Sequence, residues 1–123
     1  MKPYGISTDK LLAVREREAK RLDGMLGKSK ALHERAKASQ PCGVPMAWMM
    51  GLYEHLPMFV ESAGGSWFTD VDDNRYLDMN QADVASFMGY GSHVITQALA
   101  DRASRGGSFL LPTEDGIVVT EML

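Results

Sequence analysis

The sequence predicts an α+β fold in which helices precede and follow a small antiparallel sheet. Apolar residues recur at helical spacing before residue 40, alternate with polar residues between residues 58 and 79, and return to helical spacing after residue 91. Side chains repeat every 3.6 residues around a helix and every two along a strand, so the change of period marks the change of element. At 123 residues, the chain has the size of one domain.

Residues 1–40 predict a helical arm. Gly24 and Gly27 each destabilise a helix by up to ~1 kcal/mol relative to alanine, and they leave open whether the arm is one bent helix or two. The arm should end before Pro41, because the residue that precedes a proline avoids helical geometry. The spacing of its apolar residues is compatible with one apolar helical stripe, formed by Leu11, Leu12, Val14, Ala19, Leu22, Met25 and Leu26.

Residues 41–57 predict an apolar loop rich in methionine and tryptophan. Two prolines and two glycines between residues 41 and 51 disfavour any regular element there. An apolar loop must be covered, and two interpretations remain open. The loop is either a packed connector or the wall of a ligand pocket, in which methionine offers adaptable surface and tryptophan a flat face.

Residues 58–79 predict a three-stranded antiparallel meander. Ala63-Gly64-Gly65 is expected to form the first turn. Asp72-Asp73-Asn74 is expected to form the second, because Asp and Asn bond their own backbone and tolerate left-handed conformations. The expected strands, rich in aromatic and apolar residues, are 58–61, 66–70 and 75–79.

The second turn also matches the beginning of a calcium-binding loop, because Asp70, Asp72 and Asn74 place oxygen ligands at alternate positions. Such a loop needs glycine at its sixth position and a bidentate glutamate at its twelfth. Arg75 and Gln81 occupy those positions, and the preceding sequence is typical of a strand rather than a helix. The hairpin interpretation is therefore preferred.

Residues 80–123 predict an irregular loop followed by two helices. Asp83 lies in the loop among small and apolar neighbours, where a carboxylate is either a turn or cap residue or a pocket group whose ionisation matters. Ser92 and Thr113 are expected to cap the two helices. The second helix runs into Met122-Leu123 without a cap, a pattern typical of an interrupted rather than a finished helix.

Composition limits the classes of partner and compartment. The net charge of −3 gives no electrostatic footprint for nucleic acid, and the basic residues before position 40 alternate with acids as on a solvated helical face. The single cysteine, Cys42, excludes an internal disulfide and fits a reducing compartment. No apolar stretch approaches ~20 residues, and the N-terminus does not resemble a secretory signal. A cytoplasmic protein without a membrane span is expected.

Complete catalytic or metal-binding motifs are not found in the sequence. The three histidines (His33, His55 and His93) are too far apart for a recognisable zinc pattern. There is no nucleophile elbow, no P-loop and no G-x-G-x-x-G motif. Residue types alone therefore predict an α+β piece with no catalytic or metal residue that could be named.

Four sequence blocks nevertheless follow one another in a characteristic order. They are PCGV at 41–44, FTDVDDNRYLD at 68–78, Gly89 before a helix, and RGGSF followed by PTE between 105 and 114. With these blocks, the segment from residue 43 to residue 123 resembles the N-terminal portion of class III, pyridoxal-phosphate-dependent aminotransferases. Within them, it is similar to the glutamate-1-semialdehyde aminomutase-like branch. Two residues depart from the family pattern. Asp73 stands at the position of the family's turn glycine. Met49 stands at the position of an arginine of the aminomutases, and this second departure argues against aminomutase specificity itself.

The resemblance implies a fold-type I transferase of several hundred residues. Its large parallel-sheet domain, its cofactor lysine and its phosphate-binding Ser-Gly-Thr loop would lie outside this chain. All six lysines precede residue 38 on a polar helix, which lacks the desolvated site that a cofactor lysine needs. The resemblance therefore assigns no catalytic or cofactor-binding residue here. The complete enzyme would use pyridoxal 5'-phosphate to move an amino group between an amino compound and a keto acid or aldehyde, as a homodimer. The piece alone would be inactive.

The same resemblance suggests three substrate-binding residues. Met46 and Trp48 fall at substrate-side positions of the first loop, and Asp83 falls where the aminomutases have a pocket aromatic. A carboxylate there would repel a substrate carboxylate by about 1–4 kcal/mol at 4 Å, so it would favour an amino or uncharged polar group. The alternative is a non-catalytic interaction module, or a decayed aminotransferase, that docks on a partner through the Met/Trp loop and the last helix.

Overall fold

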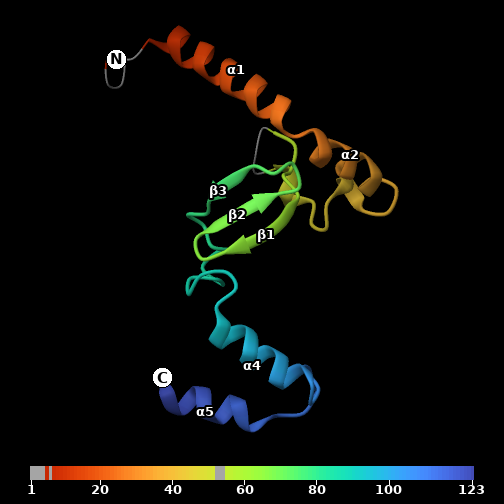
Figure 1. Cartoon of the computed structure of the whole chain (residues 1–123), viewed down its shortest axis with the longest axis vertical. Coiled ribbons are helices and arrows are strands. Elements are labelled where there is room, and N and C mark those ends of the chain that lie inside the picture. Colours follow the sequence, from red (N-terminus) through yellow and green to blue (C-terminus); the bar gives the residue numbers. More distant parts are fainter. Residues whose placement is uncertain (1–4, 6, 52–54) are drawn as a thin grey trace. The chain divides into compact units, whose positions relative to one another are not determined.

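A computed structural model describes residues 5, 7–51 and 55–123 (Figure 1). It divides into two units, Met1–Tyr90 and Gly91–Leu123, and each is described by itself. The elements of the first unit are α1 (Thr8–Met25), α2 (Gly27–Ala36), the 3-10 turn η2 (Pro41–Gly43), α3 (Trp48–Gly51), β1 (Val60–Gly64), β2 (Trp67–Asp70) and β3 (Arg75–Leu77). The second unit contains α4 (His93–Ala103) and α5 (Glu114–Met122). This α+β arrangement confirms the predicted fold class.

The helical arm consists of two helices rather than one bent helix. The helical conformation is interrupted at Leu26, where φ is −106° and ψ is 41°. Leu26 itself is buried, and α2 buries Ser29, which bonds Asp72 and Phe59, and His33, which bonds the carbonyl of Cys42 in the following turn. By contrast, α1 buries none of its residues: Leu11, Leu12 and Val14 are exposed, and Leu22 and Met25 are half-buried.

The interruption between α1 and α2 is held by the tip of the β2–β3 hairpin. The Asp72 carboxylate accepts hydrogen bonds from the backbone N–H groups of Lys28 and Ser29, the second of them at 2.9 Å. Asn74 Nδ2 donates to the carbonyl of Met25 at 3.2 Å. The tip therefore satisfies backbone groups at the start of α2 and the end of α1 that have no partner within their own helices. The sequence suggested only a turn role for these residues.

The three strands form the predicted antiparallel meander in the order β1-β2-β3. The predicted first strand and first turn are wrong in position, because Ala63 and Gly64 belong to β1 and pair with Phe68 and Trp67. This pairing leaves a two-residue connection at 65–66, the commonest hairpin length, and Gly65 adopts the positive φ (58°) that such a turn requires. Local composition favoured a longer glycine turn, and strand pairing shortened it.

The Met/Trp-rich loop also contains more regular structure than predicted. Pro41–Gly43 forms a 3-10 turn and Trp48–Gly51 a short helix, so the prediction of no regular element was wrong. Pro41 is compatible with the turn because it lies at the turn's first position, where no N–H donor is needed. A side chain at Gly43 would place its Cβ 2.6 Å from Cδ2 of the buried His33, so this close approach requires glycine.

The loop after β3 is irregular, as predicted, but its backbone is unusual. Gln81, Ala82, Asp83 and Val84 all have positive φ values between 52° and 64°. Consecutive left-handed residues with side chains cost roughly 1–2 kcal/mol each. The loop is held in this conformation by bonds to the Asp78 carboxylate before it, and by the backbone pairing of Tyr90 with Gly65 after it.

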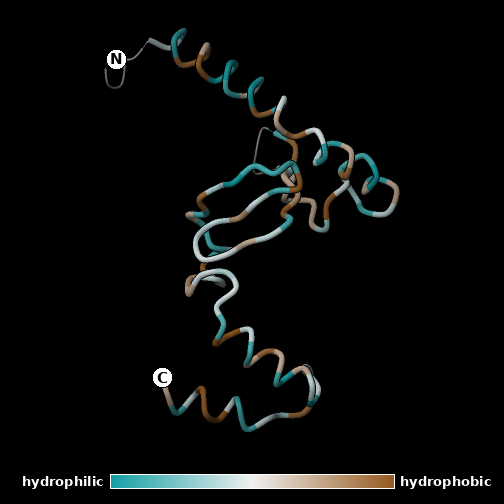
Figure 2. Tube along the Cα trace, viewed as in Figure 1, coloured by the Kyte–Doolittle hydropathy of each residue, from teal (hydrophilic) through white to brown (hydrophobic). Residues whose placement is uncertain are grey.

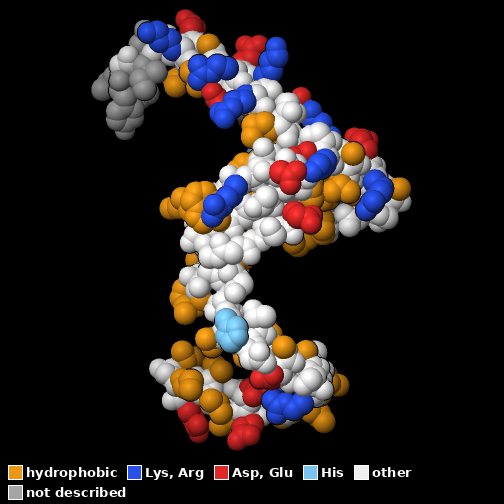
Figure 3. Space-filling model, in the orientation of Figure 1, with side chains coloured by type: hydrophobic (Ala, Val, Ile, Leu, Met, Phe, Trp, Pro, Cys, Tyr) orange, Lys and Arg blue, Asp and Glu red, His pale blue; other side chains and the backbone are white. Residues whose placement is uncertain are grey.

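Few apolar side chains are buried in the described structure. Leu26 and Val44 are the only buried hydrophobic residues among those described, and α4 and α5 bury none. Figure 2 shows hydrophobic residues recurring along the helices of the second unit, and Figure 3 shows apolar side chains on the surface of this unit. Leu110 in this unit is fully exposed. In the described residues, none of the helices has the length and apolar character needed to cross a bilayer.

Candidate functional site

A cavity of about 490 Å³ lies in the first unit, and this volume is within the range of small-molecule binding sites. Its walls come from α3, the segment before β1, strands β1 and β2, and the loop after β3. Its described lining residues are Trp48, Met49, His55, Pro57, Met58, Val60, Phe68, Asp78, Asn80, Ala82 and Tyr90. The hairpin register therefore brings the Met/Trp-rich segment and the left-handed loop to one site.

The first wall is built by the short helix α3. Trp48 lines the cavity, and its indole Nε1 donates to the Met46 sulfur at 3.4 Å. Met46 is not among the lining residues and contacts the site through Trp48. The Trp48 side chain remains half exposed, so its flat face is available to a neighbouring group.

The opposite wall carries the only acidic side chain among the described lining residues, Asp78. Its Oδ2 accepts a hydrogen bond from the Tyr90 hydroxyl at 2.7 Å, and its Oδ1 accepts from the N–H groups of Asn80 and Gln81 at 2.8 and 2.9 Å. The Tyr90 hydroxyl, followed by these N–H donors, holds the pKa of Asp78 below its usual range. Asp78 is thus a fixed negative charge at neutral pH.

The hydrogen bond between Asp78 and Tyr90 also determines the protonation state of Tyr90. The hydrogen bond to Asp78 raises the pKa of the Tyr90 hydroxyl, so this hydroxyl stays protonated. Sequence reasoning missed both residues. The available signal was local: an aspartate at the end of a strand, followed two residues later by Asn80, is typical of a side chain that bonds the backbone of a turn.

Asp83 lies on the left-handed loop and is exposed. Its Oδ1 accepts from Asn80 Nδ2 at 2.8 Å, and its N–H donates to Asn80 Oδ1 at 2.7 Å. Asp83 is not among the described lining residues, although Asn80 and Ala82 are. The structure therefore brings Met46 and Trp48 together, and places Asp83 next to residues of the opposite wall.

Cations are scarce at this site. No Lys or Arg occurs among the described residues that line the cavity. A lysine of α2 and the lysine that follows this helix instead form surface ion pairs, Lys28 with Asp73 at 2.8 Å and Lys37 with Glu34 at 2.6 Å. Within the described ranges, no group of three or more His, Cys, Asp or Glu side chains is arranged to hold a metal ion.

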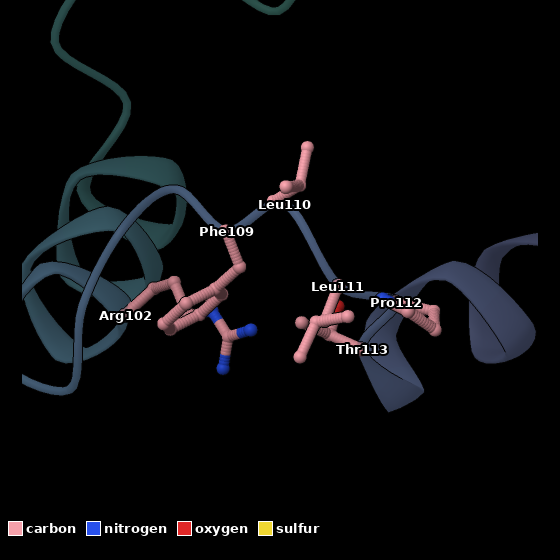
Figure 4. Close-up of a pocket in the computed structure, with 6 residues that line it drawn as sticks. All are labelled: Arg102, Phe109, Leu110, Leu111, Pro112 and Thr113. Carbon is pink, nitrogen blue, oxygen red and sulfur yellow. The ribbon is translucent and has the colours of Figure 1, made fainter.

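A second hollow lies in the second unit between α4 and α5 (Figure 4). Arg102 lies over the ring of Phe109 at 5.3 Å and forms an ion pair with Asp115 at 3.1 Å. Figure 4 shows Leu110 projecting away from these side chains. The hollow is mainly an exposed apolar surface, in contrast to the polar and aromatic site of the first unit.

Comparison with known proteins gave relatives that extend well beyond this chain. No family model matches it. The glutamate-1-semialdehyde 2,1-aminomutase of Myxococcus xanthus is 35% identical over 97 residues, covering 77% of this chain and 22% of the relative. The chain thus spans about a quarter or less of the length of the curated relatives it matches.

Solved structures similar to this chain also extend well beyond it. A glutamate-1-semialdehyde-aminomutase from Pseudomonas aeruginosa is 28% identical and covers 94% of this chain and 26% of its own, with a TM-score of 0.83. The same enzyme was also solved, as a variant, in complex with PMP. A transaminase with PLP bound matches 76% of this chain and 22% of its own at a TM-score of 0.67 and 28% identity.

Proposed function

We propose that this chain is a partial class III pyridoxal-phosphate-dependent aminotransferase of the glutamate-1-semialdehyde aminomutase-like branch, and that it supplies one wall of the substrate pocket of such an enzyme. The complete enzyme would transfer an amino group between an amino compound and a keto acid or aldehyde. The observation that carries the proposal is the cavity lined by α3 and the left-handed loop, in a chain that buries few apolar side chains among its described residues.

The described residues do not fit the cofactor itself. A lysine that holds pyridoxal 5'-phosphate must be desolvated enough to lose its proton. Lys10, Lys20, Lys28 and Lys37 are exposed, and Lys30 forms an ion pair with Asp23 at 2.7 Å. Cofactor binding and the covalent chemistry are therefore assigned to parts of the enzyme that this chain does not span.

The proposed role of the described residues is to shape and orient. Trp48 provides a flat wall for the substrate, and Met46 holds the indole through its sulfur. Asp83 adds negative charge beside the opposite wall, which disfavours an approaching carboxylate. Supporting geometry comes from Asp78, whose bonds to Asn80 and Gln81 fix the backbone of that wall.

We further propose a cytoplasmic homodimer with this division of the chain: an arm (1–40), a pocket-wall loop (41–57), a meander (58–79) and a connection to the large domain (80–123). The support is the exposed apolar surface of α1, α4 and α5, which a partner subunit or the large domain would cover. The lone exposed Cys42 is compatible with a reducing compartment.

The first experiment is to read the coding sequence beyond Leu123. A Ser-Gly-Thr loop followed by a lysine downstream would support the proposal. The complete protein, purified with pyridoxal 5'-phosphate, should then show cofactor absorbance that is lost when that lysine is replaced by alanine. An in-frame stop would overturn the enzyme proposal and support the interaction module, for which the exposed faces of α4 and α5 would be the docking surface.

A further inference from the structure

We propose that the cavity of the first unit binds the apolar body of an aryl or alkyl amine in preference to a matched ligand that carries a carboxylate. The inference rests on the proposed function, because it names the substrate class of that same pocket. Three independent observations support it: the sign of the charge on the wall, the shape of the lining side chains, and the engagement of the polar groups.

The charge on the wall is negative. Asp78 is the only carboxylate among the described lining residues, and it accepts hydrogen bonds at both oxygens. No described lining residue is a lysine or arginine that could neutralise it or pair with a ligand carboxylate. A wall with one sign of charge attracts the opposite sign, so the site favours ammonium over carboxylate.

The lining side chains are broad and apolar. Trp48, Phe68 and Tyr90 contribute aromatic surface, and Met49 and Met58 contribute flexible thioethers. Phe68 is braced by a stacked contact with Tyr76, with ring centroids 5.0 Å apart. Aromatic and methionine surfaces fit flat or branched apolar groups and also attract cations weakly.

The polar groups of the lining are already engaged with the protein. The Tyr90 hydroxyl donates to Asp78, and Asn80 Nδ2 donates to Asp83. His55 donates its Nδ1 hydrogen to the carbonyl of Leu56 at 2.8 Å. A ligand carboxylate needs several charge-assisted donors, and it would have to break these bonds to obtain them.

The test is a pair of probes with a similar apolar body and opposite charge. N,N-dimethyl-2-phenylethylamine has a tertiary amine that cannot condense with a bound aldehyde, and 3-phenylpropanoate carries a carboxylate instead. Isothermal titration of each into the complete protein that contains this chain should give at least about tenfold tighter binding of the amine, a ratio well above the error of the method. Equal affinity, tighter binding of 3-phenylpropanoate, or binding of neither probe would overturn the inference.

Variants at Met49 provide the matched control. Met49→Arg introduces a cation on the wall and should move the ratio toward 3-phenylpropanoate by about tenfold or more. Met49→Leu keeps the volume and the absence of charge, so it should leave the preference for the amine in place. An unchanged ratio in Met49→Arg would show that the probes bind elsewhere and would overturn the inference, provided that circular dichroism shows the variant to be folded.

Amino-transfer assays separate this inference from the proposed function. Selective binding of the amine without transfer from any amino donor would reject the aminotransferase and leave the charge preference standing. Transfer that prefers 4-aminobutanoate to its neutral isostere 4-aminobutanamide would support the aminotransferase and reject the charge preference. If both proposals are correct, the enzyme should transfer the amino group from both donors and should prefer 4-aminobutanamide.

Discussion

Cys42 occupies a backbone position that suits glycine. Its φ of 59° lies in the left-handed region, and its side chain is exposed. Replacing it with glycine removes strain of about 1–2 kcal/mol, partly offset by the greater freedom of glycine in the unfolded chain. Cys42→Gly should therefore raise the free energy of unfolding of the complete protein by about 0.5–1 kcal/mol in a urea titration.

The adjacent position gives the matched control. Gly43 also has a positive φ, and a Cβ there would lie 2.6 Å from the His33 ring. Gly43→Ala should lower the free energy of unfolding by more than 1 kcal/mol, because it adds both backbone strain and a clash. Equal effects of the two substitutions would contradict the conformation described for this turn.

Asp83 carries the specificity hypothesis drawn from the sequence. Its charge is exposed, so solvent and salt screen its effect on a ligand in the cavity. Asp83→Asn in the complete protein should raise the rate with acidic amino donors relative to neutral ones by about threefold, less at high salt. Glu18→Gln on α1 makes the same change in net charge and should leave the ratio unaltered. Unchanged relative rates in Asp83→Asn would exclude a role for this residue in selecting the donor.

At the level of elements, the contact between Asp72 and α2 joins the hairpin to the helical arm. Asp72→Ala removes the acceptor for the N–H groups of Lys28 and Ser29 and should cost about 1–2 kcal/mol of unfolding free energy. Asp73→Asn removes only the exposed ion pair with Lys28 and tolerates the same left-handed backbone, so it should cost about 0.5 kcal/mol or less. Similar losses for both variants would contradict a capping role.

The same contact predicts acid sensitivity. Burial raises the pKa of Asp72, but hydrogen bonds from Ser29 and Lys28 overcome it and leave the pKa below its usual range. A depressed carboxyl pKa contributes stability above the unfolded value of about 3.9, and this contribution is lost as pH falls through the folded value. The complete protein should lose stability below about pH 4, and Asp72→Asn, which keeps a capping oxygen, should show a shallower slope over that range in denaturation at several pH values.

The sequence predicted those elements whose causes are local. The Asp72-Asp73-Asn74 turn follows from residues that bond their own neighbours, as Asp70 does with the N–H groups of Asp72 and Asn74. The capping of α2 was not predictable, because Asp72 and Lys28 are 44 positions apart. The hydrogen bond between Asp78 and Tyr90 was not predictable for the same reason, since Tyr90 lies twelve positions further on. Composition and resemblance both pointed to Trp48, which lines the cavity.

Over the whole chain, the two units differ in what holds them together. In the first, hydrogen bonds join the hairpin tip to the arm and fix the left-handed loop to Asp78, and few apolar side chains are buried. In the second, α4 and α5 are joined by the Arg102–Asp115 ion pair and leave their apolar side chains exposed. Surface ion pairs contribute little to stability, so the second unit depends on burial of those side chains by other protein.

This dependence can be measured on the 123-residue chain produced alone. With Leu26 and Val44 as the only buried hydrophobic residues among those described, hydrophobic burial is too small to offset the conformational entropy lost on folding. The isolated chain should bind a hydrophobic dye such as ANS strongly and unfold without a cooperative transition. In the complete protein at equal concentration, dye binding should fall, and the amides of α4 and α5 should become protected from hydrogen exchange. Cooperative unfolding of the isolated chain with weak dye binding would show that it folds independently, and would favour an interaction module over a part of an enzyme.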